Sequence, residues 1–457
     1  MYCRFGRIVS LASGLTMVAC GSAFGEKWVD AHAAAGGNGT KDAPYRTIQE
    51  AIAAASANET IWVKPGDYAT GETRDAFSDG GNLARVLITK PLRIESTDGA
   101  AATHIVGARS DTTSETASAA KDNGLGDNSV RCVTADDNAV GSILKGFTIR
   151  GGRSRYANNQ NVFAAHGGGI ASHKENALTV VDCVISNNVA TRGGACHRVN
   201  LVRSLLTHNK ATNNGGAATR VCYHYACILA HNGDADNSTS KSAISDPRSV
   251  IHCSLFGNGN GGLYLEADYA AKVYNSIVIL EGNNNGTSKS INIGSETTKA
   301  PTLSKCVCSL INNAATKVTV DTSDLIDGSV KPWQTMVSPY SGDYRAVKGG
   351  FCDGTANPTV VSPSWVPEEF RGMDFYGRPF LAGGKANIGA VAASAKVVGG
   401  VHVLNGSVTW SVDGYEKNLG YGEKMYVRGT PAESITLRET GENKRLFVHD
   451  CGYSFAA

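Results

Sequence analysis

One eight-residue pattern stands four times in the middle of the chain: VDCVISNN at 181–188, VRSLLTHN at 202–209, YACILAHN at 225–232 and IHCSLFGN at 251–258. Each copy has a small residue third, mostly apolar residues after it and asparagine last. The small residues are 21, 23 and 26 positions apart. Short β-type segments that recur at this period without a helical pattern are typical of a β-solenoid, so we predict stacked coils.

In a solenoid, equivalent residues of successive coils lie above one another at about the strand spacing of 4.8 Å. The pattern therefore predicts an inward column of small side chains, formed by Cys183, Ser204, Cys227 and Cys253. It also predicts a ladder of side-chain hydrogen bonds between the final asparagines, Asn188, Asn209, Asn232 and Asn258. Stacked cysteines of this kind are expected to act as small apolar residues, while a disulfide between adjacent coils stays open. The spacing of Cys306 and Cys308 is too short for a zinc half-site.

Glycine pairs recur with the same rhythm, at 168–169, 193–194, 215–216 and 261–262, each before an expected strand. When the coils are aligned on the second glycine, the residues four places on are His173, Arg198, Arg220 and Glu266. With the neighbouring His197, they predict a charged file at the outer edge of one face. An arginine there could neutralise a carboxylate and a histidine could act as base. Solvated surface charge that arises from stacking alone stays open as the alternative.

The N-terminus predicts export. Arg4 and Arg7 precede an apolar run at 8–19 that is too short to span a bilayer. Two ways of processing remain open: cleavage after a signal peptide at 1–25, or lipidation of Cys20 as in a bacterial lipoprotein. No other segment is apolar for long enough to cross a membrane. The expected location is therefore secreted or at the bacterial cell surface.

Three domains follow from the patterns along the chain: the signal peptide, a β-helix at 26–394 and a small β domain at 395–457. Residues 45–55 predict an amphipathic helix that covers the open end of the solenoid, with Ile48, Ala51, Ile52 and Ala55 on one face. The last sixty residues show short alternating strands with glycine and asparagine turns, which predict a β-sandwich-like fold.

Composition limits the partners. The chain of 457 residues carries a net charge of +2 and only 18% charged residues, which gives no argument for nucleic acid. The patterns predict no cofactor, although Asp234, Asp236 and Asn237 could hold calcium if they are not simply a solvated loop. The oligomeric state does not follow from these patterns.

Three segments resemble a known superfamily. They are 28–68, with a helix leading to a strand and a Pro-Gly turn, LKGFTIRGG at 144–152, and DFYGRPF at 374–380. They resemble the pectate-lyase-like superfamily of right-handed parallel β-helices, and the repeated glycine and asparagine units resemble those of polymorphic outer-membrane proteins. The resemblance implies an all-β, right-handed parallel β-helix. The catalytic signatures of its polygalacturonases, pectin esterases and pectate lyases do not match here, so it assigns no catalytic residue.

Two functions follow from the resemblance and the charged file. The first is a secreted or surface β-helix protein that binds an extracellular acidic polysaccharide, in the manner of an adhesin. The second is a polysaccharide lyase or glycoside hydrolase with a non-standard active site on the β-helix face. The sequence does not decide whether the protein is an enzyme. It predicts His173, His197, Arg198, Arg220 and Glu266 as the ligand-binding residues.

Overall fold

The computed structural model describes residues 25–75, 81–112, 123–156, 163–213, 215–233, 242–259, 261–265, 269–280, 289–326, 335–339, 343–347, 350–392, 397–412, 415–419, 424–428 and 436–450. The signal region with Cys20, the acidic loop with Asp234, Asp236 and Asn237, and Glu266 lie outside these residues. Predictions for them stay predictions.

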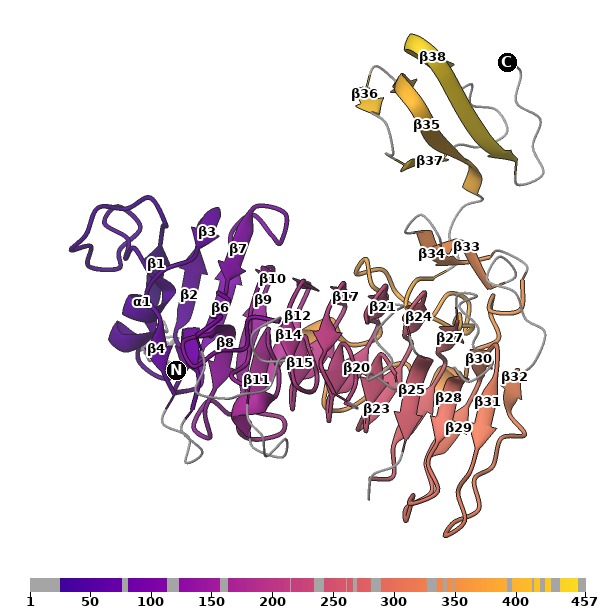
Figure 1. Cartoon of the computed structure of the whole chain (residues 1–457), viewed down its shortest axis with the longest axis horizontal. Coiled ribbons are helices and arrows are strands. Elements are labelled where there is room, and N and C mark those ends of the chain that lie inside the picture. Colours follow the sequence, from indigo (N-terminus) through magenta and orange to yellow (C-terminus); the bar gives the residue numbers. More distant parts are fainter. Residues whose placement is uncertain are drawn as a thin grey trace, which may run out of the picture.

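Three ten-stranded sheets form a right-handed parallel β-helix, in which each coil contributes one strand to each sheet in turn (Figure 1). Sheet A contains β1 (Glu26–Val29), β2 (Thr60–Val63), β6 (Arg93–Ser96), β9 (Ser142–Lys145), β12 (Leu178–Val181), β16 (Asn200–Val202), β20 (Tyr223–Tyr225), β23 (Ser249–Ile251), β26 (Lys272–Tyr274) and β29 (Thr302–Ser304). Sheet B contains β3 (Gly66–Tyr68), β7 (Thr103–Val106), β10 (Thr148–Arg150), β13 (Val184–Ser186), β17 (Leu205–Thr207), β21 (Ile228–Ala230), β24 (Ser254–Phe256), β27 (Ile277–Ile279), β30 (Cys306–Cys308) and β32 (Leu325–Ile326). The predicted architecture is confirmed.

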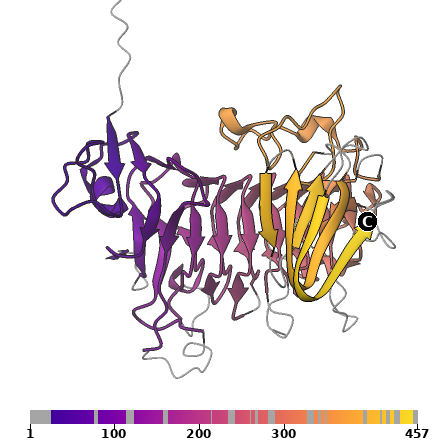
Figure 2. The same ribbon diagram turned by 90° about the horizontal axis from the view of Figure 1, so that it is seen from above.

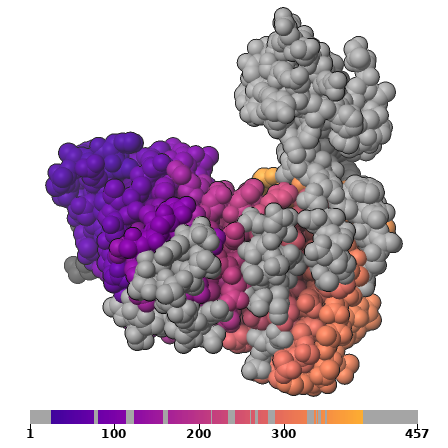
Figure 3. Space-filling view, viewed as in Figure 1, coloured from indigo at the N-terminus to yellow at the C-terminus, as the bar shows by residue number. Residues whose placement is uncertain are grey.

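Sheet C contains β4 (Thr73–Arg74), β5 (Leu83–Ile88), β8 (Val130–Ala135), β11 (Ile170–Ser172), β15 (Cys196–His197), β19 (Thr219–Arg220), β22 (Ile244–Ser245), β25 (Gly261–Leu265), β28 (Lys289–Ile293) and β31 (Ile311–Asn313). Its strands are parallel except for the antiparallel pair β4 and β5. A short parallel pair, β14 (Val189–Ala190) and β18 (Lys210–Ala211), joins two coils beside it. The colours of Figure 3 run in sequence order along the body, as they must when coils are added one by one.

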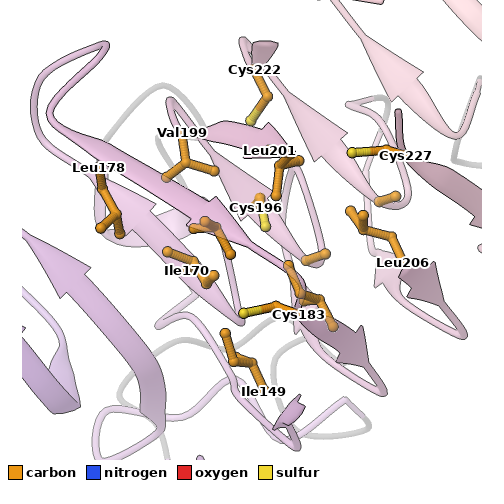
Figure 4. Close-up of a cluster of buried hydrophobic side chains, with 14 of the residues drawn as sticks. Ile149, Ile170, Leu178, Cys183, Cys196, Val199, Leu201, Leu206, Cys222 and Cys227 are labelled. Atoms are coloured by element: carbon orange, nitrogen blue, oxygen red, sulfur yellow. The ribbon is translucent and has the colours of Figure 1, made fainter. Parts of the chain in front are cut away.

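The interior holds aliphatic residues and thiols in columns. In sheet B, Ile149, Ile185, Leu206 and Leu229 are paired in register and fully buried. Cysteines lie among them in Figure 4. Nine cysteines of the described residues are buried and free: Cys132, Cys183, Cys196, Cys222, Cys227, Cys253, Cys306, Cys308 and Cys352. Burial raises the pKa of the Cys183 thiol to about 12, so it is neutral and fills space as predicted.

The predicted column and asparagine ladder are both present. Register pairs place Cys183, Ser204, Cys227 and Cys253 at one level of successive coils, each after a residue with φ between 48° and 54°. The ladder follows at the next corner. Side-chain Nδ2 groups donate to the Oδ1 of the next coil over 3.0, 2.9 and 3.0 Å, along Asn188, Asn209, Asn232 and Asn258. All four asparagines are buried.

The register expected from the glycine pairs is wrong. Ile170 pairs with Cys196, and Cys196 pairs with Thr219, so Gly169 is level with Ala195, and not with Gly194. The reason is local conformation, because one glycine of each corner takes a left-handed φ, and these glycines are Gly167, Gly193 and Gly216. Gly216 is the second glycine of its pair, whereas Gly193 is the first of its own. The run Gly167-Gly168-Gly169 contains two pairs, and the pair that occupies the corner is the first.

A helix forms where the sequence predicts one. α1 (Ile48–Ala54) begins at Thr47, whose side chain accepts from the Glu50 main-chain N–H, while Glu50 accepts from the Thr47 main-chain N–H. This reciprocal capping fixes the first turn. Ile48 and Ile52 are buried in the core cluster that also contains Val29 of β1. Figure 1 places the helix at the N-terminal end of the coils.

Residues 350–392 run along the outside of the coils (Figure 2). They contain two 3₁₀ turns, η3 (Pro358–Val360) and η4 (Glu368–Phe370), and follow the hairpin β33 (Met336–Ser338) with β34 (Asp343–Ala346). Phe380 and Ile388 pack against Tyr225, Ile228 and other outward residues of sheets A and B. The Tyr225 hydroxyl donates to the Val361 carbonyl oxygen at 2.6 Å. We call residues 350–392 the strap.

The C-terminal strands form one antiparallel sheet, and not the two packed sheets of the expected sandwich. β35 (Val397–Val412) pairs with β36 (Tyr415–Leu419), β37 (Lys424–Arg428) and β38 (Thr436–Asp450). The long strand β35 pairs with each of the other three described strands of this domain. None of them is therefore left to form a second sheet. The domain boundaries at 25/26 and 394/395 stay a prediction from the sequence.

A buried histidine should make the fold sensitive to acid. His252 stacks on Phe380 with ring centroids 4.0 Å apart, and burial lowers its pKa to about 3. An unfolded histidine titrates near pH 6.5, so the unfolded state binds more protons between these values and stability falls as the pH falls. The free energy of unfolding should fall from pH 7 to pH 5 in the wild type. In the His252→Gln variant we expect this fall to be smaller by about 2 kcal/mol. Urea unfolding at both pH values measures this, and equal losses in the two proteins would contradict it.

Candidate functional site

The outer face of sheet C brings basic residues of neighbouring coils together. Successive strands pair Ala171 with His197, His197 with Arg220, and Arg220 with Ser245. The residues before them, which include Cys196 and Ile244, are buried in the core, so strand alternation directs this file outward. It continues through Tyr264, Asn292 and Asn312.

A short segment covers part of this face. Residues of η1 (Phe163–Ala165) and the following His166 are buried against it. The His166 ring lies 4.5 Å from the His197 ring, and Phe163 meets His173 edge-on at 4.5 Å. His197 is consequently only 2% exposed although its position points outward. Its Nδ1 makes no hydrogen bond to a described residue.

Arg131 on β8 holds the covering segment in place. Its side chain is wholly buried and donates to the carbonyl oxygens of Gly167 at 2.7 Å and His166 at 2.8 Å. The same guanidinium donates to Thr134 Oγ1 at 3.0 Å and faces the buried Asp75 carboxylate at 3.4 Å. Nothing in the sequence distinguished this arginine, because a single charge inside an apolar strand gives no repeat signal.

The structure brings four of the five predicted site residues together, although not in one file. His197 and Arg220 are register partners, whereas Arg198 lies one residue further, at a corner with φ 56°. Arg198 Nη1 donates to the His173 carbonyl oxygen at 3.1 Å. His173, Arg198 and Arg220 therefore do not form the predicted single file, because the observed strand register differs from the alignment on the second glycine of each pair. Glu266 lies outside the described residues.

Among the described residues, positive charge is in excess at this place. Arg198 has no carboxylate within ion-pair distance among the described residues, and Arg220 has only Asp246, at 3.8 Å. Burial is the main cause that lowers the pKa of Arg220, and the charges of Arg192 and Arg198 lower it further while Asp246 opposes them. Arg248, on the same side of the coils, is by contrast paired with Glu175.

Both histidines of the site are neutral at neutral pH. Burial lowers the pKa of His197 well below its usual value, and the nearby His166, Arg198, Arg220 and Arg131 add to this. The pKa of His173 is also lowered, mainly by burial, with Asp75 opposing. A neutral imidazole can accept a proton. Only His173 is partly exposed, although its Nε2 atom is itself buried.

No metal centre is formed within the described ranges, where no group of three histidine, cysteine, aspartate or glutamate side chains is placed to hold an ion. The residues suggested for calcium are not among them. Likewise, no helix of the described part of the chain is long and apolar enough to cross a membrane.

Comparison with protein families matches residues 33–238 to a family described as "Protein of unknown function (DUF1565)". A comparison with curated proteins found no match. Among solved structures, a pectate lyase, Pel9A, is 12% identical with a TM-score of 0.43, over 82% of this chain and 98% of that chain. Pectin methylesterase from carrot is 11% identical with a TM-score of 0.32, over 72% and 92%. Pectin methylesterase PemA from Erwinia chrysanthemi is 11% identical with a TM-score of 0.29, over 70% and 97%. We carry no activity over from these distant likenesses.

Proposed function

We propose that the protein is a secreted or surface β-helix that binds an extracellular acidic polysaccharide on the outer face of sheet C. The observation that carries this is the pair Arg198 and Arg220. They lie on adjacent coils, with the Arg198 main-chain N–H donating to the Arg220 carbonyl oxygen at 3.3 Å. One loosely placed carboxylate, Asp246 at 3.8 Å, is all that the described residues offer to balance them.

Guanidinium groups suit the carboxylates and sulfates of such a glycan, because their planar forks donate two hydrogen bonds to one anionic group. A linear chain laid along the coil axis meets one outward side chain per coil. Beyond Arg220 the same register continues through Ser245 and Tyr264, which are buried, to Asn292, which is partly exposed. The anionic groups of the glycan would thus bind at the arginines, and the hydroxyl groups of the glycan would lie along the rest of the file.

Polygalacturonate is the probe that tests this. We expect Arg198→Ala and Arg220→Ala each to raise the Kd about tenfold or more, since a charge-assisted hydrogen bond contributes roughly 1.5–3 kcal/mol. Binding should also weaken as salt rises. Arg46→Ala is the matched control, because Arg46 is exposed and its side chain makes no hydrogen bond or ion pair with a described residue. Unchanged affinity in both site variants, or an equal loss in the control, would contradict the proposal.

The same experiment decides between binding and catalysis. A lyase would need a base for the proton next to the uronate carboxylate and a cation to neutralise that carboxylate. His173 is partly exposed and Arg198 contacts its backbone, so these are the residues to test. Ultraviolet absorbance from unsaturated uronates that disappears in His173→Gln would establish a lyase. Binding without product supports the adhesin-like role.

A further inference from the structure

Two tryptophans form a separate aromatic surface at the N-terminal end of sheet A. Trp28 on β1 and Trp62 on β2 are register partners, with ring centroids 6.2 Å apart and planes inclined by 32°. Their neighbours Val29 and Ile61 are fully buried, so alternation directs both indoles outward. We call Trp28 and Trp62 the tryptophan pair.

One carboxylate fixes the orientation of both rings. The indole N–H groups of Trp28 and Trp62 donate to the two oxygens of Glu26, at 3.2 and 3.0 Å. The Lys41 ammonium lies 5.0 Å from the centre of the Trp28 ring. The two rings are therefore held side by side, with the Glu26 carboxylate at their N–H edges and the Lys41 ammonium over one face of Trp28.

The apolar rings of the tryptophan pair lack the cover that other outward residues of sheet A have. Further along the same outward column, Val181, Val202 and Tyr225 pack under the strap. Neither tryptophan belongs to a core cluster of the described residues, and both are partly exposed. Large aromatic side chains left at a surface with ordered polar neighbours are characteristic of binding sites.

We propose that the tryptophan pair is a second carbohydrate subsite, which stacks neutral sugar rings. A pyranose ring presents an apolar C–H face and hydroxyl groups around its edge. The C–H face can stack on an indole, and the hydroxyl groups can exchange hydrogen bonds with the Glu26 carboxylate and the Lys41 ammonium. Two rings on adjacent strands suit two successive sugars of a chain. This subsite lies on another sheet than Arg198 and Arg220 and does not depend on them.

Neutral oligosaccharides test the proposal: cello-, xylo-, manno- and galacto-oligosaccharides, titrated by calorimetry and tryptophan fluorescence. We expect at least one to bind, and Trp28→Ala or Trp62→Ala to weaken it by about tenfold or more. Glu26→Ala, which frees both indole N–H groups, should weaken it severalfold. Circular dichroism checks that each variant is folded.

Trp365→Phe is the matched control, because Trp365 is a partly buried strap residue whose ring packs against Tyr223 on the outer face of the same sheet. It should change the fluorescence and leave the affinity unchanged. Arg198→Ala should also leave neutral-sugar affinity unchanged, which separates this test from that of the sheet C site. Failure of all four sugars to bind, or binding that persists in the Trp28→Ala/Trp62→Ala variant, would overturn the proposal. So would cosedimentation with phosphatidylcholine vesicles that is lost in this variant, since the surface would then be a lipid contact.

Discussion

Replacing Arg131 by methionine is expected to lower the free energy of unfolding by about 4 kcal/mol, because it removes the buried cation that faces a buried carboxylate. The Asp75 carboxylate is 3% exposed and faces Arg131 at 3.4 Å. The carbonyl oxygens of Gly167 and His166 also lose their donor. Methionine fills a similar volume, so the loss is one of polar contacts and not of packing. Urea unfolding followed by circular dichroism measures it.

Two further variants identify the cause. Arg109→Met removes an exposed arginine whose partner is Asp111, and should cost less than about 1 kcal/mol. The Arg131→Met/Asp75→Asn double variant should be less destabilised than the sum of the single variants, because both members of the facing charge pair are then removed. Equal effects of Arg131→Met and Arg109→Met would show that the buried network contributes little.

Replacing Asn209 by alanine should cost about 3 kcal/mol or more, since several buried polar groups lose partners at once. Asn209 Nδ2 donates to the Ile185 carbonyl oxygen at 2.8 Å and to Asn232 Oδ1 at 2.9 Å. Its Oδ1 accepts from the main-chain N–H and the side chain of Asn188. The ladder thus joins three coils at this residue, and urea unfolding should show its loss.

Asn209→Asp tests whether hydrogen bonding is the cause. Aspartate has nearly the same shape but cannot donate, and its charge would face Asn232 Oδ1 in a buried position. We expect it to be destabilised at least as much as the alanine variant at pH 7. Asn313→Ala, at an exposed position, should change stability little. A stable aspartate variant would show that the ladder is not held by these donors.

The repeat predicts the fold well because stacking puts equivalent residues in equivalent surroundings. Cys183 and Asn188 could be placed from their copies alone, since a column must suit every coil it crosses. The helix at Ile48–Ala54 was also predictable, because its capping and apolar spacing are local. In both cases the information lies within a few residues or in an exact repeat.

The site was less predictable because it depends on register. A shift of one residue exchanges the two faces of a strand, and Gly167-Gly168-Gly169 allows two alignments. The charge type of Arg198 and Arg220 could therefore be foreseen, but their relation to each other could not. The covering segment and Arg131 depend on contacts between distant residues that do not repeat, so the sequence carries no pattern for them.

The eight thiols inside the coils have a consequence for how opening of the coils could be observed. Burial raises the pKa of Cys183, Cys222 and Cys306 to about 12, and the thiolate is the reactive form. While the coils stay closed, an alkylating reagent finds neither access nor nucleophile. Each cysteine thus becomes reactive only when its own turn of the chain separates from its neighbours. The native sequence therefore contains chemical reporters of local unwinding from Cys132 to Cys308, with no label to be introduced.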